Sequence, residues 1–539
     1  MKPFNEPYTW VMDRLPPHIL MATITACCGS GMLLFGYDQG VLGGVLTGRP
    51  FETRFPSLVT NSTLQGFTVA VYELGCAAGA IFAFFYGDRL GRRLAIQLGM
   101  VVLSIGAILQ FMSYGLPQLI VGRIVTGLGN GLNTATIPVY QNETSKAHHR
   151  GRAVVIENIF GVMLAYWVDY GLRNNQTDAQ WRLPLALQVV FAIITLSMII
   201  FTPESPRWLA AQGKLTAARD VLWRLDGSPD EKSRAASVDV QMNEILAAIE
   251  AERKVASGFK TCFTMGEQRF FHRVFLGMGS QFMQQICGIN LITYYAPVIF
   301  ERSVGMSHDT SLLLSGLNGV AYFISALVPI PLIERVGRRK LLLFSVIGQT
   351  ITMAILAATT KQVGNKGAGI CAAVMLFVFN FFFASGLLSI PWLYPAEVNP
   401  LAVRAQGAAL ATTTNWLMTF VVVMVTPVAT STITWKYYLV WMCTNASFIF
   451  VVYFFYVETT GQTLEDLDLL FTQEKSWLIG PKSARMAREI RQRRNATRQE
   501  QVATGAATIA AHKAGIAGMR PLDLEHVEEA SDDAQLKKE

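Results

Sequence analysis

Residues 87–93 read GDRLGRR and residues 333–339 read IERVGRR, so one charged pattern occurs twice in the chain. Each copy follows one apolar run and precedes another. Working outward from the two copies gives six runs in each half, at 19–45, 64–86, 94–114, 117–139, 153–172, 184–202, 274–299, 311–333, 341–360, 368–394, 407–428 and 435–457. Six runs on either side of a polar stretch predict two pseudo-symmetric six-helix bundles.

The composition suits a membrane protein of this size. A membrane-spanning helix needs about 20 mostly apolar residues, and 51% of the 539 residues are hydrophobic. Only 15% are charged, against roughly 25% in soluble domains. We therefore predict an all-α membrane protein with twelve transmembrane helices.

Other classes of function lack a signal in the sequence. The net charge of +7 is spread along the chain rather than gathered in a basic patch, which argues against a nucleic-acid partner. The seven cysteines show no metal-ligand spacing, and no nucleophile–base constellation or phosphate-binding loop stands out. The sequence thus predicts a protein that is not an enzyme and holds no metal or cofactor.

The polar segments around the runs define the domains. We assign 1–18 to an N-terminal tail, 19–202 to the first bundle, 203–273 to an amphipathic helical linker, 274–457 to the second bundle and 458–539 to a partly disordered C-terminal tail. Lys and Arg are enriched in the loops after the second, fourth, eighth and tenth runs, which predicts that both termini and the linker are cytoplasmic. Asn61 and Asn175, each in a glycosylation tripeptide, then fall in outer loops.

Acidic and basic residues recur in matching cytoplasmic loops of the two halves. In each half a glutamate also precedes an arginine by seven positions. We interpret these groups as a latch of charge-assisted bonds between the bundles, which holds the inner side shut and breaks on inward opening. Positive-inside topology alone is the other reading. The latch comprises Asp88, Arg92, Arg93, Glu143 and Arg150 in the first half, and Glu334, Arg338, Arg339, Glu397 and Arg404 in the second.

Ionisable residues inside the apolar runs are candidates for function, because charge is costly in a membrane. Asp38 lies late in the first run and Arg123 lies early in the fourth, which places them at matching depth. A carboxylate beside an arginine can carry a proton and release the arginine each time it is protonated; a static buried pair is the alternative. Glu73 lies in the second run, and its position alone assigns it no role.

Uncharged polar residues gather in the second half. Gln284, Gln285 and Asn290 lie in the seventh run and are followed by Tyr295. Amides both donate and accept hydrogen bonds, which suits hydroxyl groups. Pro391 and Pro395 break the tenth run beside Trp392, whose ring offers an apolar face to a sugar, and Asn415 adds another amide. Together these residues predict a site for a small polyhydroxylated solute, whereas each alone is compatible with helix packing.

These motifs resemble the sugar porter family of the major facilitator superfamily over residues 19–470. The resemblance rests on FGYDQGV (35–41), GRIVTGLGNG (122–131), PVYQNE (138–143), PESPRWL (203–209), QQICGIN (284–290), PWLYPAE (391–397), VETTGQTLEDLD (457–468) and the two repeated loops. Within the family the chain is similar to fungal members that transport glycerol with protons or transport hexoses.

The resemblance implies roles for individual residues. It implies that Gln284, Gln285, Asn290, Trp392 and Asn415 contact sugar, that Phe35 lines the cavity, and that Asp38 and Arg123 couple a proton. It also implies a plasma-membrane importer of a monosaccharide or polyol that works as a monomer in the lipid bilayer. A facilitative uniporter, a non-transporting sugar receptor and an exporter are the alternatives.

The fifth apolar run departs from the family pattern. Relatives carry about three more residues between Gly151 and Ala165, and three residues shorten a helix by roughly 4.5 Å and rotate it by about 60°. Asn158 is then the nearest candidate for a polar contact from this helix.

Overall fold

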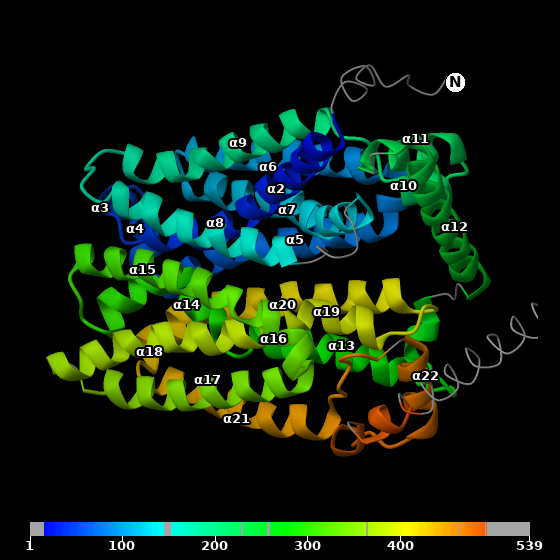
Figure 1. Ribbon diagram of the computed structural model, residues 1–539. Coiled ribbons are helices and arrows are strands. Elements are labelled where there is room, and N and C mark those ends of the chain that lie inside the picture. Colours follow the sequence, from blue (N-terminus) through cyan, green and yellow to red (C-terminus); the bar gives the residue numbers. More distant parts are fainter. Residues whose placement is uncertain are drawn as a thin grey trace, which may run out of the picture.

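The chain folds into two layers of helices that lie side by side (Figure 1). Every regular element in the described residues is helical. The computed structural model describes residues 16–144, 152–227, 230–255, 259–362, 365–462, 464–483, 485–490 and 492.

The first layer contains the first six spans. They are α2 (Pro17–Val45), α5 (Ser62–Leu90), α6 (Arg92–Phe111), α7 (Leu116–Thr144), α8 (Arg152–Gly171) and α9 (Ala179–Ile200). Two short helices, α3 (Arg49–Arg54) and α4 (Pro56–Thr60), connect α2 to α5. Within the layer α7 packs against both α5 and α6, and α2 packs against α8 and α9.

The second layer repeats this arrangement with three broken spans. They are α13 (Phe270–Gln285) with α14 (Ile289–Val298), α15 (His308–Leu327) with α16 (Pro329–Val336), and α18 (Lys366–Ser385) with α19 (Ile390–Val398). The continuous spans are α17 (Arg338–Thr360), α20 (Arg404–Thr432) and α21 (Lys436–Phe455). Gly288, with φ of 99°, separates α13 from α14, because few other residues adopt this backbone.

The helices of both layers are suited to a lipid bilayer. Within the described residues nine spans are long and apolar enough to cross it by length and composition. The more polar α7, the α13–α14 pair and α8 complete the twelve. At 20 residues, α8 extends roughly 30 Å, enough to cross the hydrocarbon core. The predicted class, an all-α membrane protein with two six-helix bundles, is confirmed.

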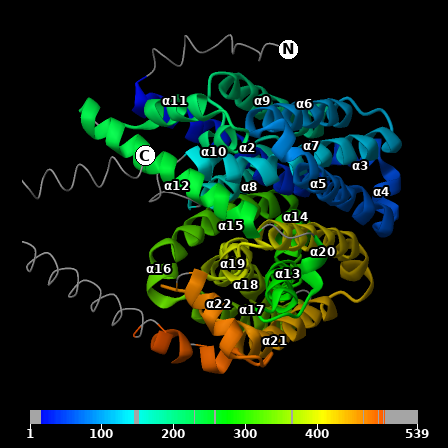
Figure 2. The same cartoon turned by 90° about the vertical axis from the view of Figure 1, so that its right-hand side faces the viewer.

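The linker helices lie at one end of the bundles. They are α10 (Pro206–Ala211), α11 (Leu215–Leu225) and α12 (Glu231–Val255), and α22 (Leu464–Gln473) lies at the same end (Figure 1). We call this the linker end and the opposite one the distal end. Ser205 caps α10 by accepting the N–H of Trp208 at 3.1 Å, and Arg207 pairs with Glu252 of α12. Figure 2, which views the linker end, shows the two bundles as separate groups of helices.

The bundles meet along three helix pairs, α5 with α20, α8 with α15, and α2 with α14. At the distal end Ser62 Oγ lies 3.4 Å from Ser431 Oγ. A Cβ on Gly66 would come within 2.2 Å of the Met424 carbonyl, so that only glycine permits this approach of α5 to α20. The two bundles are therefore in close contact at the distal end.

Candidate functional site

The amides of the second bundle form one continuous hydrogen-bond network. Asn290 Nδ2 donates to Gln285 Oε1 at 2.5 Å, and Gln285 Nε2 donates to Gln284 Oε1 at 3.2 Å. Asn415 Nδ2 of α20 donates to Gln284 Oε1 at 2.8 Å and to Gln281 Oε1 at 2.6 Å. All five side chains are buried. The structure thus brings together four residues predicted from the sequence and adds Gln281.

The network is anchored on the break between α18 and α19. Gln284 Nε2 donates to the carbonyls of Leu387 and Leu388 at 2.8 and 2.9 Å, and Gln281 Nε2 donates to the carbonyl of Pro391 at 2.9 Å. The break leaves the Leu387 and Leu388 carbonyls without intrahelical partners, and Pro395, which has no N–H, leaves the Pro391 carbonyl without one. The two glutamine side chains satisfy these carbonyls. The spacing of Gln281 from Gln284, one helical turn, is the sequence signal that could have found it.

The predicted aromatic residues differ in their surroundings. Trp392, on α19, is 39% exposed. Phe35 of α2 is buried and packs edge-on against Trp416 of α20, with ring centroids 5.5 Å apart. Tyr295 is buried and donates its hydroxyl to the Val423 carbonyl at 3.0 Å, so it braces α14 against α20.

The centre of the first bundle is charged. Asp38, Tyr72 and Arg123 are all fully buried. Tyr72 donates its hydroxyl to Asp38 Oδ2 at 3.2 Å, and the Arg123 guanidinium lies 4.5 Å from the centre of the same ring. The matching depth of Asp38 and Arg123 predicts a direct pair. In the described part of the chain, however, no contact between them falls within ion-pair distance, because the Tyr72 side chain contacts both.

Arg123 keeps an incomplete set of partners. Its Nη2 donates to the Val69 carbonyl at 2.9 Å, and its Nε and Nη1 have no protein partner among the described residues. Asp38 Oδ1 is likewise buried without one. Buried polar atoms without hydrogen bonds are rare in folded proteins, and they concentrate at functional sites.

The two centres are joined across the bundle interface. Phe35 lies one turn before Asp38 on α2, and Trp416 directly follows Asn415 on α20. Their ring contact therefore connects the charged centre with the amide network. A second connection runs from Glu73 of α5, which accepts the hydroxyl of Tyr294, one turn after Asn290 on α14.

The charged residues at the linker end pair within the first bundle. Arg92 donates to Glu143 from Nε at 2.9 Å and from Nη2 at 3.1 Å, and it also pairs with Asp88 at 3.0 Å. Arg93 Nη2 donates to the Ile200 carbonyl at 3.1 Å. Arg150 lies outside the described residues.

The second bundle repeats these pairs. Arg338 bonds to Glu334 and Glu397, each at 2.9 Å, and Arg339 Nη2 donates to the Tyr453 carbonyl at 2.6 Å. Arg404 Nε donates to the Asn399 carbonyl at 3.2 Å.

The latch between the bundles is expected to break on inward opening, and this structure is closed at the distal end, so the latch stays a prediction. The described ion pairs of both sets stay inside one bundle, because α6 and α7 pack side by side and bring Arg92 next to Glu143. The same holds for Arg338 and Glu397 in the other half.

Two further glutamates complete these clusters. Glu204 accepts the backbone N–H groups of Arg92 and Arg93 at 3.0 and 3.1 Å, and Glu458 accepts those of Arg338 and Arg339 at 2.8 and 3.2 Å. Each acid therefore caps a helix N-terminus. Burial raises the pKa of Glu204 from its ordinary value, whereas the N–H groups and Arg92 oppose that rise. The sequence signal was present, since Glu204 and Glu458 are separated by the same interval as Glu143 and Glu397.

Three remaining predicted positions are also described. The Asn158 side-chain oxygen on α8 is buried without a protein partner in this part of the chain, and its backbone packs against α2 at Gly36. Asn61 is exposed at the distal end and caps α5 by accepting the Leu64 N–H at 3.0 Å. Asn175 is half-buried, and its side-chain oxygen accepts from Thr177.

Comparisons with known proteins agree with this architecture. A family model described as "Sugar (and other) transporter" matches residues 22–471. The chain is 39% identical to the MFS-type transporter oryC of Aspergillus oryzae, covering 90% of this chain and 92% of that protein. It is 38% identical to the sugar transporter STL1 of Saccharomyces cerevisiae, covering 87% and 84%. These relatives are transporters rather than enzymes.

Solved structures give the same result. The proton:xylose symporter XylE bound to 6-bromo-6-deoxy-D-glucose is 26% identical and superposes with a TM-score of 0.70, over 84% of this chain and 99% of that one. The inward-open conformation of the xylose transporter XylE from E. coli reaches 0.69 at the same identity and the same coverage.

Proposed function

Because the chain belongs to the sugar (and other) transporter family, we propose that it imports a monosaccharide or polyol together with a proton, by alternating access across the plasma membrane. The observation that carries this proposal is the pairing of two unlike centres, a neutral amide network and a buried charge cluster, across one interface. Amides suit the hydroxyl groups of the solute, and a buried carboxylate beside an arginine suits a proton.

The distal end would face the outside of the cell. Asn61 lies at that end, which agrees with the glycosylation tripeptides falling outside. Removal of N-linked glycan from the expressed chain should then increase its electrophoretic mobility. A double variant with Asn61→Gln and Asn175→Gln should migrate like the deglycosylated chain.

The cycle follows from these positions. Asp38 takes a proton from outside, and the solute replaces amide–amide bonds around Gln284 and Asn415. The distal contacts then close, as in the present structure, and both ligands leave from the linker end. The ion pairs at that end keep each bundle rigid while the bundles move as units.

Uptake of labelled hexoses and glycerol in transporter-null yeast, with and without an uncoupler, tests the proposal. We expect concentrative uptake that the uncoupler abolishes. Asp38→Asn should remove accumulation against a gradient and retain exchange of labelled for unlabelled solute. Uptake that is unchanged by the uncoupler would rule out proton symport.

Facilitative transport of the same solutes is the second candidate. It is favoured by one observation, that Asp38 accepts its hydrogen bond from Tyr72 rather than pairing directly with Arg123. In that case equilibrative uptake should be equal in the wild-type chain and in Asp38→Asn.

A further inference from the structure

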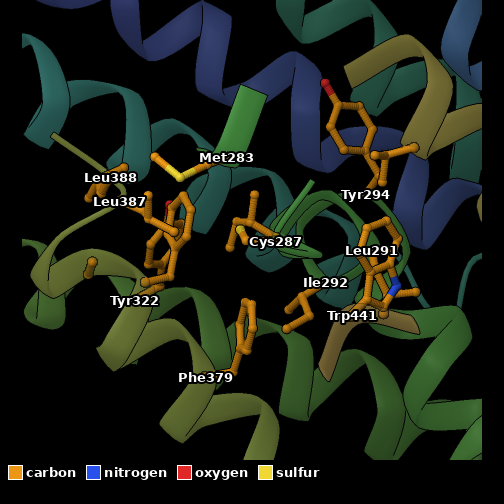
Figure 3. Packing of buried hydrophobic residues seen from close by; sticks show 14 of the residues in the cluster. Met283, Cys287, Leu291, Ile292, Tyr294, Tyr322, Phe379, Leu387, Leu388 and Trp441 are labelled. Atoms are coloured by element: carbon orange, nitrogen blue, oxygen red, sulfur yellow. The ribbon is translucent and has the colours of Figure 1, made fainter. Parts of the chain in front are cut away.

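Glu73 is a second carboxylate at the charged centre, to which the proposed cycle assigns no role. It is fully buried, on the helix that also carries Tyr72. Its Oε1 accepts the hydroxyl of Tyr294, and its Oε2 has no protein partner among the described residues. Figure 3 shows the Tyr294 side chain pointing away from the second bundle's core residues, such as Cys287 and Phe379, towards the blue helices of the first bundle.

The Tyr294 residue belongs to the distal closure. Its carbonyl lies 3.0 Å from the position that a Cβ on Gly43 of α2 would occupy, so α14 presses directly on α2. The following residue, Tyr295, has non-helical backbone angles and marks a kink in α14. The Glu73–Tyr294 hydrogen bond therefore spans the interface where the two bundles close.

Among the described residues, few titratable groups face Glu73. They are Asp38 on α2, Arg123 on α7, Tyr294 on α14, and Tyr72 and Cys76 on its own helix. Arg123 is the one cation in this set, against two carboxylates. With both acids ionised the cluster carries a net negative charge, and one bound proton makes it neutral.

We propose that Glu73 is the proton-controlled element of the distal gate: the gate closes over Glu73 when the carboxyl is protonated and is released when it ionises. Closure removes this carboxyl from water, which penalises the ionised form far more than the neutral one. The protonated carboxyl still accepts the Tyr294 hydroxyl. The proton comes from the distal solution and leaves towards the linker end, so no other reactant is needed.

This inference rests on the proposed symport and explains its direction. Protonation outside permits closure of the distal gate with solute bound. Loss of the proton inside leaves an ionised Glu73 in a closed interface, which drives the empty protein back to the distal-open state. Asp38 and Glu73 thus share the proton site, and Glu73 contributes the hydrogen bond to the opposite bundle.

Distance measurements across the gate test the inference without requiring transport. Spin labels at Ser62→Cys and Ser431→Cys, whose native hydroxyls lie 3.4 Å apart, report closure. The background carries Cys371→Ser and Cys443→Ser, because these cysteines are not buried. In liposomes, acidification from about pH 7.5 to 5.5 should raise the ratio of closed to open protein about threefold or more.

Glu73→Gln keeps a hydrogen-bond acceptor and cannot ionise, so its gate should stay closed at both pH values. Glu157→Gln, which changes a half-buried carboxylate of α8 outside the cluster, should respond as the unmodified chain does. Tyr294→Phe removes the hydroxyl that Glu73 accepts, so it should lower the fraction of closed protein at pH 5.5. This variant tests the inference if Glu73→Gln fails to fold. A pH response retained in Glu73→Gln, or an unchanged closed fraction in Tyr294→Phe, would overturn the inference.

Solute-driven proton movement in the same liposomes separates this inference from the proposed function. If the wild-type chain moves no protons while the gate response depends on Glu73, symport fails and the gate stands. If the wild-type chain moves protons while Glu73→Gln gates like the wild type, symport stands and the gate inference fails.

Discussion

The charged centre of the first bundle and the amide network of the second differ in chemistry within one duplicated fold. The first bundle buries Asp38, Glu73 and Arg123, and several of their polar atoms lack protein partners among the described residues. The second buries a group of neutral amides, linked by hydrogen bonds from Asn290 to Gln281. The difference indicates a division of labour, in which one half responds to charge and the other recognises hydroxyl groups.

Replacement of Arg123, the cation of the charged centre, should cause the largest loss of stability. Arg123→Leu leaves two buried carboxylates without a counter-charge, which should lower stability by about 3–5 kcal/mol. Thermal unfolding of the purified protein measures the loss. The exposed pair Arg219–Asp239 in the linker provides the control, since Arg219→Leu should change stability by less than about 1 kcal/mol. Equal effects of the two variants would contradict a charged centre.

Truncation of the Gln284 amide should lower the affinity for solute and leave proton coupling unchanged. Gln284→Ala breaks the bonds to the Leu387 and Leu388 carbonyls and to Asn415. Loss of about 1–3 kcal/mol should raise the KM for solute roughly 5- to 150-fold. Gln110→Ala is the matched control, because this buried amide of α6 donates to Thr126 of α7 in the first bundle, outside the network. A similar rise in KM for the control variant would show that the amide network does not bind the solute.

The ion pairs at the linker end recur in both bundles, so equivalent variants in the two bundles can be compared. Glu143→Gln and Glu397→Gln each weaken an arginine pair at the linker end. We expect losses of about 1–2 kcal/mol in stability that are similar in the two bundles and smaller in high salt. Thermal unfolding at low and high ionic strength measures both. A strong effect from only one bundle would show that the two clusters are not equivalent.

The smallest effect should come from the Tyr72 hydroxyl. Tyr72→Phe removes the donor to Asp38 and the acceptor of Asn130, and it keeps the ring beside Arg123. Loss of the hydrogen bond to Asp38, worth about 1 kcal/mol, should lower the solute accumulation ratio roughly fivefold. Exchange of labelled for unlabelled solute should stay constant. A change in exchange but not in accumulation would assign Tyr72 to solute binding instead.

Features that depend on local pattern were predictable from the sequence. Apolar runs and the duplicated GDRLGRR and IERVGRR loops predict the two bundles, which the structure confirms. The loops also contain Gly91 and Gly337, with φ of 82° and 100°, where a Cβ would collide with Glu204 and Glu458. The sequence therefore shows that both the glycine and the acid recur in the two halves. It does not show that the acid caps the helix that follows the glycine.

Features that depend on which helices meet were harder to predict. Residues 72 and 73 are neighbours in sequence but project about 100° apart on a helix. Tyr72 therefore contacts Asp38 inside the first bundle, whereas Glu73 contacts Tyr294 of the second. The matching depth of Asp38 and Arg123 in the sequence suggested a direct pair. Depth alone does not show that the Tyr72 ring lies between the two side chains.

The ratio of protons to solute in proteoliposomes tests the division of labour most directly. A pH-sensitive dye and labelled solute, recorded together, should show stoichiometric proton movement in the wild-type chain. Asp38→Asn should bind and exchange solute without proton movement, and Gln284→Ala should need more solute yet keep the wild-type ratio. The account is contradicted if Gln284→Ala alters the ratio while Asp38→Asn leaves it unchanged.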